Sequence, residues 1–225
     1  MSDISRSCYI VGSGPSMCGF DYEALRSCDT ITINQSLFVV PNPTYFVTKD
    51  YTWVNKAQKV QNKPLSHMDV WGAVDSYFIV GMREPRMVRV GRDCIDTKFD
   101  LRYNLSAFKN VIYTSSEGGI GMSFDDFRNG GDSGYAALQL AVILGYSRIF
   151  LLGIDMFVAG DRTHCHRDYG NRSPIAYMNK LTSFYKKWVK ALGVIHETVN
   201  CQVVSCSPIS RLNSIIPYQR IEDVL

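Results

Sequence analysis

The sequence lacks several features that would place it in a familiar class at once. It has no C-x-x-C pair, no internal repeat, no low-complexity tract, and no apolar run near the roughly 20 residues that span a bilayer. Its Gly-rich stretch is neither the dinucleotide motif G-x-G-x-x-G nor a Walker loop, which requires Gly-Lys-Ser/Thr. These absences argue against a membrane-spanning chain and against the two commonest nucleotide-binding loops.

The chain also carries little net charge and no cysteine framework. The formal charge is +3 and the pI is near 8.4, which fits a local anion site rather than a surface that coats nucleic acid. The seven cysteines are odd in number, and several lie in apolar runs, which predicts reduced core cysteines. The polar N-terminus, MSDISRS, predicts no secretory signal. We therefore expect a soluble, cytoplasmic protein.

Short, continuous apolar runs are what the chain has instead. Continuous hydrophobicity is typical of strands covered on both faces. The pattern predicts strands at Cys8–Gly12, Thr30–Asn34, Tyr45–Thr48, Ser76–Val80, Val111–Thr114, Arg148–Gly153 and Gln202–Ser205. It predicts helices at Asp21–Ser27, Ser133–Leu144 and Pro174–Leu192, with a further short helix at the end of the tail.

This alternation predicts an α/β, Rossmann-like fold in a single domain over residues 1–225. We expect a mostly parallel sheet with its first strand central and with helices on both faces. Two segments without a clear period, near 83–105 and 158–173, are candidates for a small lid or excursion; a solvated connection is the simpler interpretation of the first.

A Gly-rich turn follows the first predicted strand, at Gly12, Ser13, Gly14, Pro15 and Ser16. Glycines permit close approach of the backbone to a ligand, and Pro15 presets φ for a turn or a helix start. By itself the motif fits a phosphate loop and an ordinary tight turn about equally.

Polar residues follow the next two strands as well. Asn34 and Gln35 follow the second strand, and Lys49 and Asp50 follow the third. In a parallel sheet all these ends open at one edge, where ligands of open α/β folds bind. Their coincidence predicts a nucleotide site beside Gly12–Ser16.

The later part of the chain adds groups to the same edge. Asp132 or Ser133, followed by Gly134, is suited to begin a helix, where free backbone N–H groups gather. Asp155 lies just past a buried strand. We expect these residues to face the same ligand.

Two histidines, His164 and His166, flank Cys165 in the following loop. They are too crowded for a standard zinc framework, so we predict no metal site there. Imidazole suits proton transfer near neutral pH, which makes either one a candidate general base; a plain loop histidine is the alternative. Tyr169 could hydrogen-bond a leaving phosphate, or simply pack under the loop.

The segments "IVGSGPSMCGFDYEAL", "INQS" and "SGYAALQLAVILGYSRIFLLGIDMF" resemble the bacterial CMP-sialic-acid-dependent sialyltransferases of lipo-oligosaccharide synthesis. The layout also resembles the 6-hydroxymethylpterin diphosphokinase-like family and small phage proteins of the same signature. The resemblance covers about a third of the chain. It implies a Rossmann-like domain with a small lid.

The resemblance also implies roles for single residues. Gly12, Ser13 and Gly14 fall on the nucleotide-binding turn, Asn34 on a nucleotide contact, and Ser133 on a donor contact. His164 or His166 is the best match to the base, and we prefer His166. Three positions depart from the family: Ser13 stands where an Asn is usual, Asp132 replaces a Thr, and Phe157 stands where a Tyr holds the leaving phosphate.

Three functions remain open at this point. The favoured one is a glycosyltransferase that uses a nucleotide-sugar donor, CMP-type by resemblance, with an unknown hydroxyl acceptor and no required cofactor. The first rival is a diphosphokinase whose Asp50 and Asp155 hold Mg²⁺ against ATP phosphates. The second is a non-catalytic protein that sequesters a nucleotide, a role that Phe157 supports. A homo-oligomer is compatible with the sequence, which does not fix the oligomeric state.

Overall fold

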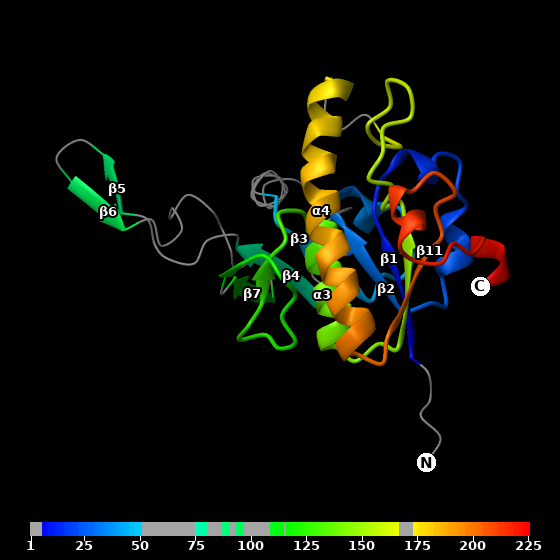
Figure 1. Ribbon diagram of the computed structural model, residues 1–225, viewed down its shortest axis with the longest axis horizontal. Coiled ribbons are helices and arrows are strands. Elements are labelled where there is room, and N and C mark those ends of the chain that lie inside the picture. Colours follow the sequence, from blue (N-terminus) through cyan, green and yellow to red (C-terminus); the bar gives the residue numbers. More distant parts are fainter. Residues whose placement is uncertain are drawn as a thin grey trace, which may run out of the picture.

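The computed structural model describes residues 6–50, 75–80, 87–90, 93–96, 109–114, 116–166 and 173–225. Its centre is one parallel sheet, seen between the helices in Figure 1. The seven strands are β1 (Ser7–Val11), β2 (Thr30–Ile33), β3 (Tyr45–Thr48), β4 (Asp75–Val80), β7 (Asn110–Tyr113), β10 (Arg148–Leu152) and β11 (Gln202–Ser205).

The strand order is β11-β10-β1-β2-β3-β4-β7, and every neighbouring pair is parallel. The chain first builds the sheet outward from β1 to β7. It then returns to place β10 on the other side of β1, where Ser7 is in register with Arg148. The order therefore reverses between β1 and β10, and such a switch point is where open α/β sheets bind ligands.

Residues of β1 alternate between two buried layers, as a strand's period of two requires. Ile10 belongs to a cluster under the long helices, together with Ile149 and Leu151 of β10. Tyr9 and Val11 belong to a separate cluster on the opposite face. Burial on both faces explains why these strands read as continuous apolar runs.

Two helices cover the first face. Helix α3 (Ser133–Ile143) contacts β1, β2 and β3, and ten of its eleven residues are buried. Helix α4 (Pro174–Thr198) is amphipathic and lies outside it, burying Leu181, Trp188 and Ile195. The Trp188 and Tyr135 rings meet edge to face, with centroids 6.0 Å apart. This contact packs α4 against the first turn of α3.

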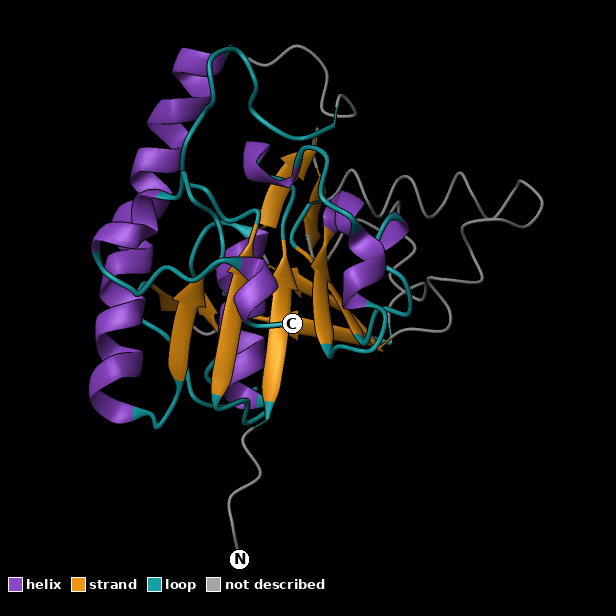
Figure 2. Cartoon of the chain, turned by 90° about the vertical axis from the view of Figure 1, so that its right-hand side faces the viewer, coloured by secondary structure: helices purple, strands orange, loops and turns teal. Residues whose placement is uncertain are grey.

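Short 3₁₀ helices cover the second face, on the side of the sheet opposite α4 in Figure 2. They are η1 (Pro15–Met17), η2 (Tyr22–Leu25) and η6 (Ile221–Asp223). The C-terminal tail packs Ile221 and Val224 on this layer, and the Tyr9 hydroxyl donates to the Val224 carbonyl. The remaining 3₁₀ helices, η3 (Asn34–Phe38) and η5 (Arg211–Ser214), follow β2 and β11.

The structure confirms the α/β, Rossmann-like fold with a parallel sheet covered on both faces. Strand β1 is an interior strand, as expected. Two helical predictions need correction: α4 continues to Thr198 instead of Leu192, and the helix expected at Asp21–Ser27 is the single 3₁₀ turn η2. Gly145, at φ +77°, directly follows the C-cap of α3.

The two lid candidates lie only partly within the described residues. In the first, β5 (Met87–Val90) and β6 (Asp93–Asp96) form a two-stranded antiparallel sheet. In the second, residues 158–166 are described and 167–172 are not. A further small sheet joins β8 (Ser116–Glu117) to β9 (Arg128–Asn129) in the connection before α3.

The free thiols are those of Cys8, Cys18, Cys28, Cys165, Cys201 and Cys206; of these, only Cys8 is fully buried, and Cys18 is exposed. The expectation of core cysteines thus holds for Cys8 and is wrong for Cys18. Among the described residues, no helix is both long enough and apolar enough to cross a membrane.

Candidate functional site

A cavity of about 530 Å³ opens at the carboxyl ends of β1, β2, β3 and β10, at the switch point of the sheet. The sequence-predicted residues that line it are Gly12, Ser13, Gly14, Pro15, Asn34, Asp50, Asp132, Ser133, Gly134, Asp155 and His164. Ser16, Gln35 and His166 are not among its lining residues, and Tyr169 lies outside the described part of the chain. The polar strand ends therefore do converge.

The Gly12–Ser16 turn is fastened to the end of β10. Gly14 donates its backbone N–H to the Gly153 carbonyl at 2.9 Å. Ser16 donates its backbone N–H and its hydroxyl to the Asp155 carboxylate, at 2.8 and 2.6 Å. Asp155 is 2% exposed. Its carboxylate oxygens therefore hold the turn in place.

The glycines of this turn are required by packing within the protein. A Cβ on Gly12 would lie 2.6 Å from the Gly153 carbonyl oxygen, and a Cβ on Gly14 would lie 2.5 Å from Asp155 Oδ2. Contacts this short do not occur between real side chains and their neighbours. The sequence argument assigned the glycines to close approach of a ligand; the structure shows that the end of β10 already occupies that space.

Two residues on the cavity wall have left-handed backbone conformations that are unusual for side chains other than glycine. Asn34 has φ +52° and Met156 has φ +50°, at the ends of β2 and β10. The Asn34 side chain is fixed by Thr48, whose hydroxyl donates to Oδ1 at 2.7 Å. Strained backbone of this kind concentrates at functional sites.

The start of α3 forms another wall. Asp132 is the N-cap: its Oδ1 accepts from the Tyr135 N–H at 2.9 Å, and its Oδ2 accepts from Trp188 Nε1 at 3.1 Å. Burial raises the pKa of Asp132 above its ordinary value, and these hydrogen bonds oppose that rise. The Ser133 hydroxyl accepts from the Lys49 backbone N–H at 3.0 Å, which ties α3 to the end of β3.

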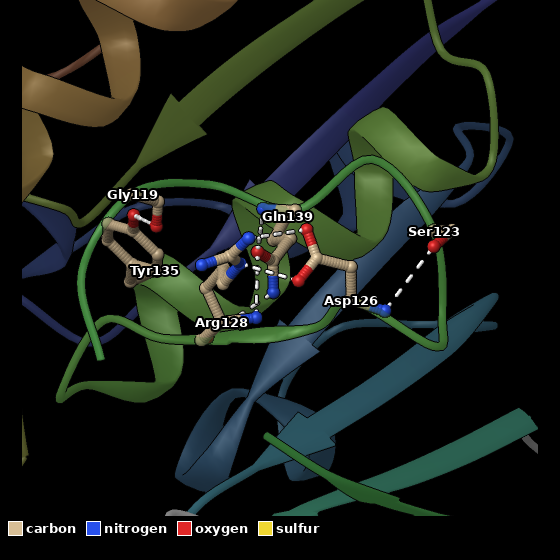
Figure 3. Close-up of polar contacts among 7 residues, drawn as sticks. Gly119, Ser123, Asp126, Arg128, Tyr135 and Gln139 are labelled. Atoms are coloured by element: carbon tan, nitrogen blue, oxygen red, sulfur yellow. Dashed lines mark hydrogen bonds and ion pairs between the residues drawn. The ribbon is translucent and has the colours of Figure 1, made fainter. Parts of the chain in front are cut away.

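The connection that leads into α3 is fixed by one buried amide, Gln139 (Figure 3). Its Oε1 accepts from the backbone N–H groups of Gly121 and Arg128, at 2.6 and 3.1 Å. The Tyr135 hydroxyl donates to the Gly119 carbonyl, and Arg128 pairs with Asp126 at 2.7 Å. Residues of α3 thereby position the segment that delivers Gly131 and Asp132 to the cavity.

Lys49 also lines the cavity; the sequence analysis placed it at the end of the third strand but gave it no role of its own. Its Nζ donates to Asn129 Oδ1 at 2.9 Å. Burial lowers the pKa of Lys49 to about 8; Lys187 lowers it further, and Asp132 partly opposes the change. Lys49 directly precedes Asp50 at the end of β3, so the same strand-end argument could have assigned it a role.

We expect Lys49→Met to be more stable than the wild type at pH 7, by about 2 kcal/mol. The folded pKa of about 8 lies below the ordinary 10.5, so between these values the unfolded chain binds more protons. Wild-type stability then rises with pH, and the advantage of Lys49→Met is full below pH 8 and is lost towards pH 10.5. Urea denaturation at pH 7, 9 and 10 measures this difference; a variant less stable than the wild type at pH 7 would contradict it.

His164 lies in the cavity wall beside Tyr177 of α4. The Tyr177 hydroxyl and His164 Nε2 are 3.0 Å apart, and His164 Nδ1 lies 3.0 Å from the Thr163 hydroxyl. The His166 ring lies behind, with its centroid 5.6 Å from that of His164. The geometry thus favours His164 over His166 as the histidine that meets a ligand.

Phe157 also lines the cavity and is 38% exposed, so its ring is available to a ligand. Within the described residues, no group of three His, Cys, Asp or Glu side chains is arranged to hold a metal ion. Asp50 and Asp155 were the carboxylates expected to hold Mg²⁺ in the diphosphokinase alternative. Both oxygens of Asp155 already accept hydrogen bonds from Ser16, so this member of the pair is engaged within the protein.

Comparison with known proteins gives a likeness of fold only. No protein-family model matches this sequence, and no curated protein matches it. The monofunctional alpha-2,3-sialyltransferase Cst-I from Campylobacter jejuni superposes with a TM-score of 0.52 at 16% identity, over 97% of this chain and 82% of that one. The sialyltransferase CstII from the same organism, in complex with cytidine-5'-monophosphate, gives 0.49 at 16% identity, over 95% and 84%.

The MAf glycosyltransferase from Magnetospirillum magneticum AMB-1 gives a TM-score of 0.47 at 12% identity, over 98% of this chain and 34% of that one. The chain has the fold of the Cst-I sialyltransferase. The likeness to diphosphokinases and to phage proteins stays a prediction.

Proposed function

We propose that the protein is a glycosyltransferase that moves a sugar from a nucleotide-sugar donor to a hydroxyl acceptor. The observation that carries this proposal is the set of residues that line the cavity at the switch point. It combines a backbone turn, Gly12–Pro15, the start of α3 and the His164–Tyr177 pair. An anion-binding end and a proton-accepting group are the two things that glycosyl transfer from a nucleotide donor needs.

Each wall of the cavity has a role in the proposal. Asn34 and the Gly12–Pro15 turn hold the nucleotide, and the N–H groups at the start of α3 face its anionic part. His164 accepts the proton of the acceptor hydroxyl as the donor bond breaks, directly or through Tyr177. The sequence resemblance to CMP-sialic-acid-dependent enzymes makes CMP the first nucleotide to test, and the fold shared with the Cst-I sialyltransferase supports a glycosyltransferase.

Because Phe157 stands where the resemblance implies a tyrosine, the leaving phosphate needs another hydrogen-bond donor. A phenyl ring cannot donate a hydrogen bond, but it offers an apolar face to a base or a sugar. Lys49 and Lys180 line the same cavity, and each carries an amine that donates hydrogen bonds. In this proposal a lysine takes the place of the phenol.

Ligand binding tests the proposal. CMP, CDP, UDP, GDP, ADP and ATP are screened for thermal stabilisation, with Mg²⁺ and with EDTA. A nucleotide at 100 times its Kd should stabilise the fold by about 2.7 kcal/mol. We expect CMP to stabilise with EDTA present. Stabilisation only by ATP with Mg²⁺ would favour the diphosphokinase, and binding without any turnover would favour the sequestering protein.

The substitution Asn34→Asp tests whether the nucleotide binds in this cavity. The substitution keeps the oxygen that accepts from Thr48 but replaces the amide N–H₂ by charge, so it should weaken nucleotide binding by about tenfold or more. Asn42→Asp is the matched control, because Asn42 is also left-handed, at φ +47°, and does not line the cavity. Equal affinities of the two variants, measured by calorimetry, would place the nucleotide elsewhere.

A further inference from the structure

The Lys49 amine is a cation built into the cavity wall. Its side chain extends from the end of β3 and is held by Asn129 Oδ1, which also accepts from the Gly131 N–H at 3.0 Å. Its backbone N–H is held by Ser133. Lys49 is thus anchored at both its main chain and its amine, beside the residues that begin α3.

The charged groups near this amine leave its positive charge uncompensated by an ion pair. Asp132, from the start of α3, attracts it, but the oxygens of Asp132 already accept from Tyr135 and Trp188. Lys187 of α4 repels it, Lys180 adds a second cation to the cavity, and Asp50 is its neighbour in the chain. In the described part of the protein, Lys49 has no salt-bridge partner.

We propose that Lys49 is a specificity-determining residue that binds, as an ammonium, an anionic oxygen group of the ligand in this cavity. The inference rests on the proposed function and deepens it, because it restricts the donor to one with a negative charge at this wall. A half-buried ammonium without an ion pair gains most from a ligand that supplies the missing charge.

A proton is coupled to this binding step. Burial lowers the pKa of Lys49 to about 8, so the free protein loses this charge in mildly alkaline solution. An anion beside the amine favours the charged form, so binding above pH 8 requires uptake of a proton. A nucleoside monophosphate is already doubly charged above pH 7, since its second pKa is about 6, and contributes no such pH dependence.

Two groups of a CMP-linked donor have the required chemistry: the phosphate, and a carboxylate on the sugar. Calorimetry with inorganic pyrophosphate, CMP and CMP-sialic acid, without acceptor, distinguishes them. The proteins are the wild type, Lys49→Met, Lys49→Arg and, as a matched control on the exposed face of α4, Lys190→Met. Each is titrated at pH 7 and at pH 9.5.

For the wild type and Lys190→Met we expect affinity to fall by about tenfold or more between the two pH values. Lys49→Met should bind about tenfold or more weakly at pH 7, with little further loss at pH 9.5. Lys49→Arg should keep its affinity at both pH values, because a guanidinium does not titrate in this range. If Lys49→Met loses affinity for both CMP and CMP-sialic acid, Lys49 binds the phosphate. If it loses affinity for CMP-sialic acid alone, Lys49 binds the carboxylate.

These titrations distinguish a failure of the role of Lys49 from a failure of the proposed function. If the wild type binds CMP and Lys49→Met binds it and CMP-sialic acid equally well, the role of Lys49 is overturned and the proposed function stands. If only pyrophosphate binds, and does so through Lys49, the anion site stands and the nucleotide donor is wrong. If none of the three probes binds the wild type, both proposals are overturned.

Discussion

Replacing Gly14 with alanine should destabilise the fold by about 3 kcal/mol or more. The new methyl group would lie 2.5 Å from Asp155 Oδ2 and 2.7 Å from the Gly153 carbonyl oxygen. Neither atom can retreat easily: one belongs to the backbone that follows β10, and the other belongs to a carboxylate whose two oxygens each accept one hydrogen bond from Ser16. The turn and the end of β10 would have to separate.

The control for this substitution is Gly193→Ala in α4. A Cβ there meets no atom within 4 Å, and the residue is exposed on a helix. The same chemical change should therefore be neutral or stabilising by about 0.5–1 kcal/mol. Urea denaturation of both proteins compares them directly. If Gly14→Ala unfolds at the wild-type urea concentration and loses only nucleotide affinity, the glycine serves the ligand and the packing argument fails.

This comparison shows where the sequence was informative and where it was not. A Gly-x-Gly turn after a strand predicts close approach of the backbone to something, but the partner is Gly153 and Asp155, about 140 residues away in the chain. No local pattern contains that partner. The position of the turn was predictable, and the physical cause of its glycines was not.

The strands were predictable for a simple reason: burial on both faces gives each one a continuous apolar run bounded by polar residues. The end of helix α4 was predicted less well: it was placed at Leu192, directly before Gly193, but the helix continues to Thr198. The helix continues because Ile195 extends the buried stripe of Leu181, Trp188 and Leu192. Packing against the core outweighs one glycine, which costs about 1 kcal/mol in a helix.

The site was predictable as a set of strand ends, since parallel strands deliver their carboxyl ends to one edge. The state of each side chain at that edge was not. Asp132 was one of the two residues predicted to begin α3, and it is the N-cap; Asp155 was expected to face the ligand, but its carboxylate holds the Gly12–Ser16 turn. Lys49, in contrast, lines the cavity while its amine donates to Asn129, and its lowered pKa follows from burial that only the folded chain creates.

The choice between the two histidines also depends on the fold. The sequence favoured His166 because Arg167 and Tyr169 beside it are suited to position an anionic leaving group. The structure instead places His164 on the cavity wall, 3.0 Å from the Tyr177 hydroxyl. Tyr177 comes from α4, so the pair forms only when that helix packs beside the loop. Because His164 lines the cavity and His166 does not, single substitutions can show which histidine acts as the base.

His164→Ala should lower the rate of sugar transfer by about 10²–10⁴-fold with little change in nucleotide affinity. A general base acts on the acceptor proton in the transition state, so its loss affects turnover more than ground-state binding of the donor. His166→Ala should retain most activity, since His166 is not among the residues that line the cavity. His196→Ala, on the exposed end of α4, is the matched control and should behave as the wild type.

Tyr177→Phe shows whether the proton passes through the phenol. If it does, this variant should lose turnover nearly as severely as His164→Ala, and the double variant should lose little more, because residues that act as one unit are not additive. If the imidazole acts directly, Tyr177→Phe should lose far less. Initial rates with donor and acceptor, alongside calorimetry with CMP, give both quantities. Full turnover in His164→Ala would remove this histidine from the mechanism, and a matching loss in His166→Ala would transfer the role to the histidine that the sequence favoured.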